Sequence, residues 1–259
     1  MILDEPSVQL LDAFLDACDS IRQRTAQFPP TDETDRRVKY RYYFYIEKSM
    51  STFEAFTLLV RNGYLYEAQI VSRANFELMV DLLYYHTAPL QLSERFEDYF
   101  QIASECEGLL LSVCGDKALI PPSDQTRIQA LKVSFCSKYD DKKFPKHWSG
   151  VDRFIDRAKT IGMERGYRAG YHLRSDIAHG GILSEASYIR FADTSLANAM
   201  NDLKQQTLHG EIGLACHEML LCLRTIEDGL GLQIYELIHD LCIKCADYAT
   251  AVGIPENPD

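Results

Sequence analysis

Apolar residues recur every three or four positions along most of the chain, and the alternation typical of β-strands is almost absent. This spacing places apolar side chains on one face of an α-helix. It predicts helices over residues 7–28, 31–61, 64–87, 92–114, 125–139 and 151–162. A further helix is expected over residues 163–178, then an irregular stretch and two C-terminal helices, bent or broken at Gly229 and Gly231. The expected fold class is all-α, an antiparallel helical bundle with extra helices.

Capping and helix-breaking residues separate these segments. Thr31, Asp32 and Thr34 have the chemistry of an N-cap, and Asn62 with Gly63 has that of a helix end. Because the connections are short, consecutive helices should pack as antiparallel neighbours. We expect a single helical domain over residues 1–259. It comprises N-terminal helices (1–115), a loop-rich excursion (116–150), and a part with the motif helix and the C-terminal helices (151–259). The remaining breaks fall at Pro29, Pro30, Pro89 and Gly115.

Composition narrows the class of protein. The chain has 259 residues, 46% of them hydrophobic and 25% charged, as in soluble globular domains. Its net charge of −11 argues against a general nucleic-acid binder, although a local RNA site remains compatible with it. No signal peptide or membrane-spanning run is apparent, so a cytoplasmic location with reduced cysteines is expected. Cys242 and Cys245 form the one C-x-x-C pair, inside a predicted helix, and we expect no metal and no cofactor.

The stretch YHLRSDIAHGG, residues 171–181, carries the chemistry that we single out. On a helix, residues three and four apart share a face. One face is expected to be buried against a closely approaching backbone, since it carries Gly166 and Gly170, residues that destabilise a helix interior by about 1 kcal/mol each. The other two faces carry the polar and aromatic candidates, which are Tyr171, Arg168, His172, Arg174, Ser175, Asp176 and His179.

Five residues advance a helix by about 140°, so Arg174 and His179 point in different directions. Two such helices meeting at a two-fold axis would bring both pairs into one composite site. A homodimer is therefore expected.

The R-x4-H spacing of Arg174 and His179 resembles the motif of the HEPN superfamily, preceded by Tyr171 and followed by a glycine. The resemblance implies a compact HEPN-like helical bundle. It also implies a metal-independent RNase of the toxin or phage-defence type, with RNA as substrate and an antitoxin as a possible partner. In that family a polar Asn or Asp often follows the arginine directly, whereas Ser175 does so here and Asp176 comes one place later.

A longer pattern resembles an uncharacterised bacterial helical family. It consists of SRANFE at residues 72–77, HWSG at residues 147–150, and Y-x3-Y-x2-R-S-x3-H-G at residues 167–180. This resemblance implies no function.

The HEPN resemblance implies roles for the motif residues. An RNA 2′-hydroxyl would attack the adjacent phosphate and leave a 2′,3′-cyclic phosphate. His179 would move a proton and Arg174 would grip the phosphate. Asp176 could orient the imidazole of His179, and Ser175 or Tyr171 could contact the phosphate.

Residues outside the motif supply further candidates for substrate binding. Arg73 and Glu77 lie one turn apart in the SRANFE segment, and we expect Glu77 to reach Arg174. Arg37 and Arg41 lie one turn apart among tyrosines that could stack on bases. A solvated basic helix face is the alternative interpretation of that run.

A non-catalytic interpretation stays open. Arg174 could pair with a glutamate inside the bundle, with His179 as a polar helix end. The chain would then be a protein-interaction module or a nucleotide sensor. Catalysis predicts that Arg174 and His179 are exposed in a shared cleft, and the structural role predicts that both make internal hydrogen bonds.

Overall fold

The computed structural model describes residues 3–171, residue 174 and residues 194–254. These residues form helices and no strand, which confirms the predicted all-α class. The long helices are α1 (Glu5–Thr25), α2 (Glu33–Arg61), α3 (Leu65–His86), α4 (Pro89–Ser112), α5 (Pro122–Tyr139), α10 (Thr194–Leu230) and α11 (Tyr235–Ala251). The short ones are η1 (Lys117–Leu119), α6 (Phe154–Thr160), α7 (Glu164–Gly166) and the π-helical turn η2 (Tyr167–Tyr171).

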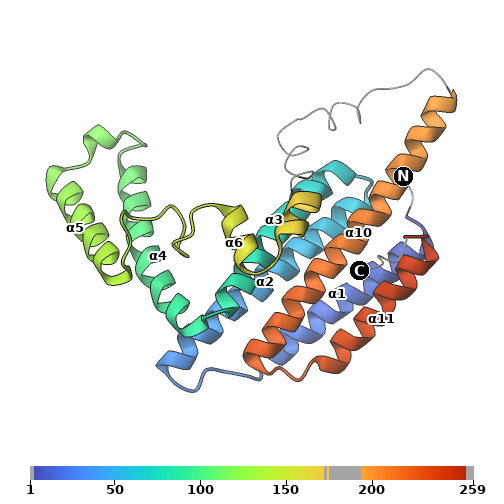
Figure 1. Cartoon of the computed structure of the whole chain (residues 1–259), viewed down its shortest axis with the longest axis horizontal. Helices are drawn as coiled ribbons and strands as arrows, with labels where there is room; N and C mark the ends of the chain where they lie inside the picture. The colour runs from blue at the N-terminus through green and yellow to red at the C-terminus, as the bar shows by residue number, and fades with distance from the viewer. Residues whose placement is uncertain (1–2, 172–173, 175–193, 255–259) are drawn as a thin grey trace.

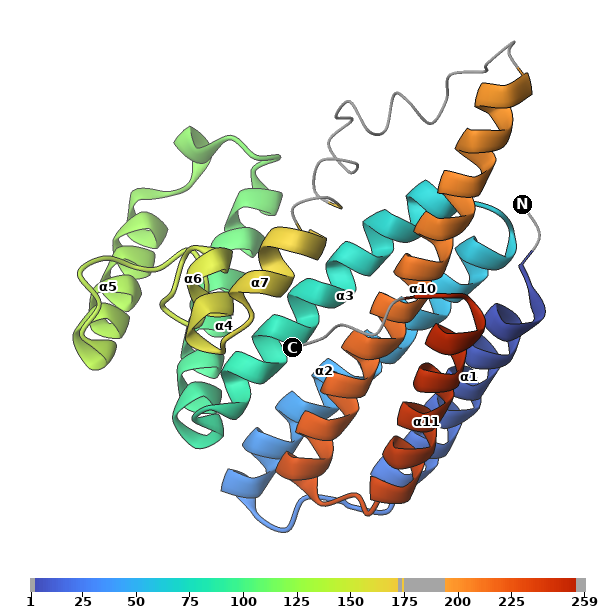
Figure 2. The ribbon, with the colours of Figure 1, turned by 45° about the vertical axis from the view of Figure 1, so that its right-hand side comes forward.

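Helices α1, α2, α3, α10 and α11 lie side by side as a bundle (Figure 1). Figure 2 shows α2, α3 and α10 adjacent to one another, with α1 and α11 together along one flank. The apolar faces predicted from the sequence meet in its interior, where Phe14, Ile46 and Met79 are fully buried. Two helices far apart in sequence, α3 and α10, therefore become neighbours, and the candidate site lies between them.

The predicted helix ends agree with the structure. The Asp32 side chain accepts the backbone N–H of Asp35 at 2.8 Å and caps α2. Gly63 ends the same helix with a φ of 80°, a conformation that favours glycine. The first helix begins earlier than predicted because Asp4 caps it, accepting the N–H of Ser7 at 3.0 Å.

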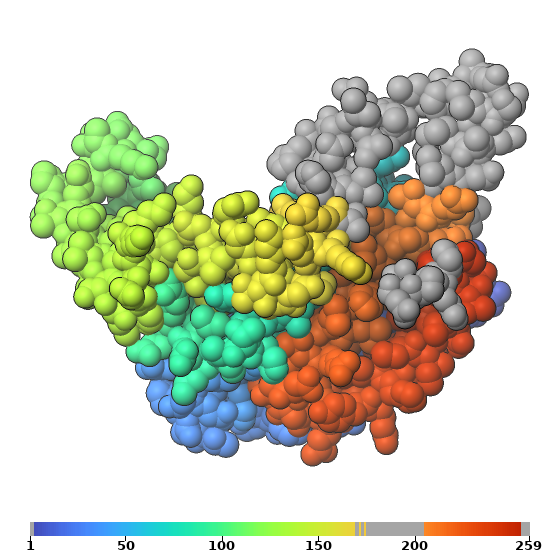
Figure 3. All heavy atoms as spheres, in the orientation of Figure 1, coloured from blue at the N-terminus to red at the C-terminus, as the bar shows by residue number. Residues whose placement is uncertain are grey.

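Helices α4 and α5 form an arm, residues 89–139, that projects from the bundle (Figure 1). In the space-filling view, the yellow segment of α6 and α7 lies between this arm and α10 (Figure 3). The loop that returns from the arm is anchored by Trp148, whose ring packs against Phe96 and Tyr84. Asp81 of α3 contacts His147 of this loop at 3.3 Å and binds Arg157 of α6 at 2.9 Å.

The predicted motif helix is not a continuous α-helix. It begins as α7, and residues 167–171 form the π-helical turn η2. A π-turn carries one more residue than an α-turn, so Arg174, which follows it, faces differently than it would on a regular helix. Such turns are frequent at functional sites.

Candidate functional site

Arg174 lies at the centre of a buried ion cluster between α3 and α10. Its side chain is fully inaccessible to solvent. Its Nε donates to Glu211 Oε2 at 3.0 Å, and its Nη1 donates to Glu218 Oε1 at 2.6 Å. Both glutamates come from α10 and are themselves buried. Arg174 therefore has the environment that the structural role predicted, and is held by internal hydrogen bonds.

The electrostatics of this cluster follow from burying one cation with two acids. Burial acts to lower the pKa of Arg174, but the carboxylates of Glu218 and Glu211 outweigh it, so that the pKa is raised. Burial raises the pKa of Glu218 to about 7 from an ordinary value of 4.5, against the opposing effect of Arg174. One arginine neutralises only one carboxylate, and the surplus acid therefore titrates near neutral pH.

Amide side chains of α3 border the same cluster. Gln69 donates from Nε2 to Glu211 Oε1 at 3.1 Å. Asn75 lies close enough to Glu218 to help lower its pKa, yet neither atom of the Asn75 amide makes a well-formed hydrogen bond among the described residues. Glu218 Oε2 likewise lacks a hydrogen-bond partner within that part of the chain.

Above the cluster, Arg73, Glu77 and Tyr171 form a partly exposed set that we call the rim. The Tyr171 hydroxyl donates to Glu77 Oε1 at 2.8 Å and accepts from Arg73 Nη2 at 3.0 Å. The Arg73 guanidinium also lies 5.0 Å from the centre of the Tyr171 ring. Glu77 therefore joins the SRANFE helix to the motif segment through Tyr171. The expectation that Glu77 binds Arg174 was wrong, because α10 supplies the carboxylates that hold Arg174.

Aromatic packing fixes the Tyr171 side chain at the rim. Its ring centre lies 4.7 Å from that of Phe154 and 5.9 Å from that of Phe76. Tyr167, one π-turn earlier, stacks on it at 5.1 Å. A tyrosine held by three rings presents its hydroxyl in one direction, which suits a group that must contact a ligand.

A cavity of about 340 Å³ lies between α3, α7 and α10. Glu218 and His217 are the residues with polar side chains among those that line it. Its apolar lining consists of Phe76, Met79, Met163, Gly166, Leu214 and Leu221. The close backbone approach predicted at Gly166 is absent here, since a Cβ added at Gly166 would meet only the Met163 and Phe76 side chains, at 3.4 and 3.5 Å. Gly166 instead leaves space that belongs to the cavity.

The remaining motif residues divide into two groups. Arg168 is exposed and pairs with Glu164 on its own helix, at 2.7 Å. His172, Ser175, Asp176 and His179 lie outside the described residues.

The second basic candidate, on α2, faces the arm. Arg37 forms ion pairs with Glu33 and with Glu97 of α4. Arg41 lies 3.0 Å from the centre of the Phe96 ring, and burial lowers its pKa. Both therefore contact α4, whereas the rim belongs to α3 and η2. The described contacts of Arg37 and Arg41 do not join them to the rim.

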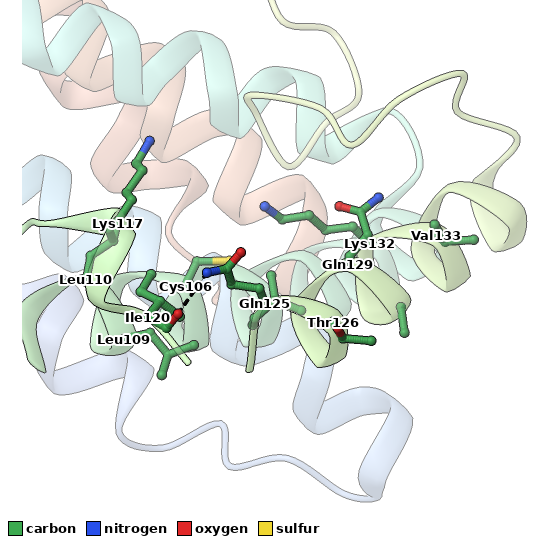
Figure 4. Close-up of a pocket in the computed structure, with 12 residues that line it drawn as sticks. Cys106, Leu109, Leu110, Lys117, Ile120, Gln125, Thr126, Gln129, Lys132 and Val133 are labelled. Atoms are coloured by element: carbon green, nitrogen blue, oxygen red, sulfur yellow. Dashed lines mark hydrogen bonds between the residues drawn. The ribbon is translucent and has the colours of Figure 1, made fainter. Parts of the chain in front are cut away.

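A larger space, which we call the groove, runs along the arm between α4 and α5 and measures about 860 Å³ (Figure 4). Its floor is apolar, with Leu109 and Leu110 from α4 and Ile128 from α5. Lys117 and Lys132 are its basic side chains. None of the predicted site residues that the structure describes lines it. Among the described side chains, no group of three or more His, Cys, Asp and Glu residues is arranged to hold a metal ion.

Sequence reasoning overlooked the residues that hold Arg174. Glu211 and Glu218 stand seven residues apart in the largely apolar run EIGLACHEMLLCL, residues 211–223. That spacing puts both on one helix face, and acids on an apolar face require a buried cation as partner. This signal was available in the sequence. The identity of the cation was not, because it comes from a segment 37 residues away from Glu211.

Comparison with known proteins identifies the family of this chain. The sequence profile of a family of unknown function, DUF5677, matches residues 44–195. The match spans the three stretches of the longer pattern noted in the sequence. No curated protein and no solved structure matches significantly. Within residues 3–171 and 194–254, no helix has both the length and the apolar character needed to cross a membrane.

Proposed function

We propose that this chain, which belongs to the DUF5677 family of unknown function, is a metal-independent endoribonuclease with a HEPN-like helical bundle. The observation that carries the proposal is the rim. A partly exposed arginine and a positioned tyrosine hydroxyl stand where the chain enters the segment with Ser175, Asp176 and His179. That combination supplies a phosphate-binding cation, a hydrogen-bonding hydroxyl and a titratable imidazole.

The proposed reaction is an internal transfer of the phosphoryl group. The RNA 2′-oxygen attacks the adjacent phosphorus, and the bond from phosphorus to the 5′-oxygen breaks. The 2′-hydroxyl gives up its proton, and the departing 5′-oxygen gains one. The products are a 2′,3′-cyclic phosphate and a 5′-hydroxyl. His179 moves one of these protons, because its ordinary pKa lies near neutral pH.

Within this mechanism the two arginines have different tasks. Arg73 contacts the phosphate, since a guanidinium fork matches phosphate oxygens and opposes the charge that builds up on them. Arg174 is a positioning residue. Its buried bonds to Glu211 and Glu218 hold it against α10, five residues before His179 in the sequence. This replaces the phosphate-gripping role that the motif resemblance implied for Arg174.

Two copies of the chain complete the site. In the proposed dimer, the rims and the His179 side chains of the two copies meet across a two-fold axis. The homodimer is therefore part of the proposal, and sedimentation of the purified protein measures it directly.

Cleavage of total transfer RNA in EDTA tests the proposal. The wild-type chain is compared with Arg73→Ala, His179→Ala and Arg168→Ala. We expect cyclic-phosphate ends from the wild type and from Arg168→Ala, and a loss of about 100-fold or more in the other two, as for removal of an acid–base group or a charge-stabilising group. Undiminished cleavage by His179→Ala, or no cleavage by a folded wild-type dimer, contradicts the proposal.

A second candidate, a protein-interaction module, is favoured by the groove in the arm. Two helices with an open apolar groove accept a third helix, and Lys117 and Lys132 beside the groove suit acidic flanks. Leu111, Leu119 and Val133, all on the arm, are exposed apolar residues. The occupant that fits is an amphipathic helix with glutamates bordering its apolar face.

A fluorescent amphipathic peptide of leucines and glutamates is the probe for this candidate. We expect it to bind the wild-type chain and to lose most of its affinity for Lys132→Glu and Val133→Glu, measured by anisotropy. The matched control is Leu58→Glu, an exposed leucine on α2. Equal binding to all four proteins removes the groove from consideration.

A further inference from the structure

Aromatic rings are exposed on both helices where α2 meets the base of the arm (Figure 1). On α2, Tyr40 and Phe44 lie one turn apart and are 59% and 49% exposed. On α4, Phe100 is 59% exposed and stacks on Phe96, with the ring centres 5.7 Å apart. We call these four rings, together with Arg41 between them, the platform. Large exposed rings gathered in one place call for a partner that covers them.

Arg41 lies among these rings without a counter-ion. Its guanidinium stands 3.0 Å from the centre of the Phe96 ring and 5.4 Å from that of Phe44. With the described side chains it forms no ion pair or hydrogen bond, and its Nε is enclosed without a partner. Glu97 acts on Arg41 only from a distance, since it binds Arg37 at 3.3 Å. A half-buried cation of this kind is stabilised when an anion approaches it from outside.

Further cations continue the row along α2. Arg37, Arg41 and Lys48 share one helix face with the two rings of α2, and a helix rises by about 17 Å from residue 37 to residue 48. The ion pairs of Arg37 are exposed, at 3.6 Å to Glu33 and 3.3 Å to Glu97, and exposed pairs contribute little to stability. A phosphate group can therefore replace these carboxylates at Arg37.

We propose that the platform binds an unpaired segment of RNA, with bases stacked on Tyr40, Phe44 and Phe100 and a phosphate bound by Arg41. This inference rests on the proposed function, because it adds a second contact for the RNA that is cleaved at the rim. Proteins that bind single strands combine cations that follow the backbone with exposed rings on which bases stack. The row on α2 consists of such rings and cations.

The character of this surface favours RNA over a protein helix. The groove in the arm is lined by leucine, isoleucine and valine, which suit the apolar face of a helix. The platform offers flat rings with a guanidinium between them, which suit the faces of bases and the charge of the phosphate. A single local contact of this size is also compatible with a net charge of −11.

Binding of a 2′-O-methyl oligouridine to the full-length chain tests the inference. This probe is single-stranded and lacks the 2′-hydroxyl needed for cleavage, and a length of about eight nucleotides falls within the usual range of site sizes. By fluorescence anisotropy, we expect it to bind at least about tenfold more tightly than a duplex of the same length, because paired bases cannot stack on the rings. No binding of the probe to the folded protein, or equal binding of the duplex, overturns the inference.

Substitutions at Phe44 test the stacking itself. Phe44→Ala should weaken binding of the probe by about fivefold or more, the effect of losing one stacked base. Phe44→Trp should keep the affinity, whereas Phe44→Leu, which keeps apolar surface without a flat ring, should not. The matched control is Tyr64→Ala, which removes an exposed ring beyond the other end of α2 and should change nothing. Wild-type affinity in Phe44→Ala or in Phe44→Leu contradicts the stacking.

The salt dependence of binding tests the phosphate contact. For single strands, each phosphate contact contributes about 0.7 to the slope of log affinity against log salt concentration. Arg41→Gln should therefore make the slope shallower by about 0.7, whereas Phe44→Ala should leave it unchanged, because the ring carries no charge. An unchanged slope in folded Arg41→Gln overturns the assigned phosphate contact.

The outcomes also separate the platform from the proposed nuclease. Probe binding that depends on Phe44, without cleavage of transfer RNA, keeps the platform and removes the endoribonuclease. Cleavage together with wild-type probe affinity in Phe44→Ala keeps the nuclease and removes the platform. If the peptide of leucines and glutamates loses affinity for Phe44→Ala and the probe does not, the surface binds a protein and the inference is overturned.

Discussion

Arg174 brings a positive charge into a region from which water is excluded, and that placement constrains what surrounds it. Removing a charge from water costs several kcal/mol, and only well-directed partners offset the cost. Glu211 and Glu218 supply two such partners from a single face of α10. Replacing Arg174 leaves both carboxylates buried without their cation. Arg174 is therefore held in the core by charge pairing with α10.

Arg174→Ala should lower the free energy of unfolding by about 3–5 kcal/mol, because it leaves two buried carboxylates without their cation. Urea denaturation followed by circular dichroism measures the change. Arg168→Ala is the matched control on the same segment, since Arg168 is exposed and its surface pair with Glu164 contributes little to stability. A loss for Arg174→Ala as small as that of the control would show that the cluster does not stabilise the fold.

Glu218 should make stability depend on pH near neutrality. Its pKa is about 7 in the folded protein and near 4.5 ordinarily, so between these values the folded state holds the extra proton. The stabilisation from this group is complete below about pH 4.5 and is lost as the pH rises through 7. The free energy of unfolding of the wild type, relative to that of Glu218→Gln, should therefore fall by about 1–3 kcal/mol between pH 5 and pH 8.

The difference between the two proteins is the informative quantity here. Asp4 and Glu164 have lowered pKa values and act in the opposite direction in both. A constant difference across this pH range would mean that Glu218 titrates as an exposed glutamate does.

For individual residues, the sequence predicted which side chains belong to the candidate site better than it predicted which of them bind one another. Tyr171, Arg73 and Glu77 were singled out from their spacing, and the structure brings them together. The partners of Arg174 were missed, because helical periodicity reports which side chains share a face and not which helix will lie opposite. The prediction that Glu77 binds Arg174 was wrong for that reason. A neighbouring hydroxyl, on Tyr171, lies within reach of Glu77.

At the scale of the elements, helix α10 contains two glycines whose replacement by alanine should change stability in opposite directions. Gly229 lies against α2, where an added Cβ would stand 2.3 Å from Cζ of Tyr42. Tyr42 cannot yield easily, since it is buried and its hydroxyl is bonded to His86 at 2.6 Å. Gly210 is on the exposed side of α10, and an added Cβ would meet nothing within 4 Å.

Gly229→Ala should destabilise the protein by about 1–3 kcal/mol through overpacking, despite the better helix propensity of alanine. Gly210→Ala should stabilise it by about 0.5–1 kcal/mol, because alanine lowers the entropy cost of forming the helix. Thermal unfolding of the two variants and the wild type gives both signs in one experiment. Two shifts in the same direction would contradict the close approach of α2 and α10.

The ends of the elements were predictable wherever a local rule decides them. Asp32 as an N-cap and Gly63 with positive φ follow from side-chain chemistry and backbone sterics. The π-turn η2 does not. Its sequence is compatible with an α-helix, and the extra residue is stabilised by tertiary contacts, namely the packing of Tyr171 against Phe154 and its bonds to α3. Non-local contacts of this kind leave no periodic trace in the sequence.

For the whole molecule, the arm should unfold locally at a lower free energy than the bundle. Helix α3 buries ten residues in the bundle, whereas α5 buries two, Ile128 and Phe135, against α4 and the returning loop. Local stability follows buried apolar contact, so α5 should open without the bundle. The groove leaves the apolar surface between α4 and α5 only partly covered, which lowers the cost of that opening further.

Amide hydrogen exchange measures this directly. Amides of α5 should exchange with opening free energies several kcal/mol below those of α3 and of the buried part of α10, and low urea should hardly change them. Amides of α3 should follow the global unfolding free energy. Because the two helices have similar lengths, helix length does not account for the difference.

Equal protection of α5 and α3 would mean that another surface covers the arm in solution, and a helix lying in the groove would produce that result. The same exchange experiment, repeated across protein concentrations, would then distinguish a second copy from contacts within one chain, since only the former depends on concentration.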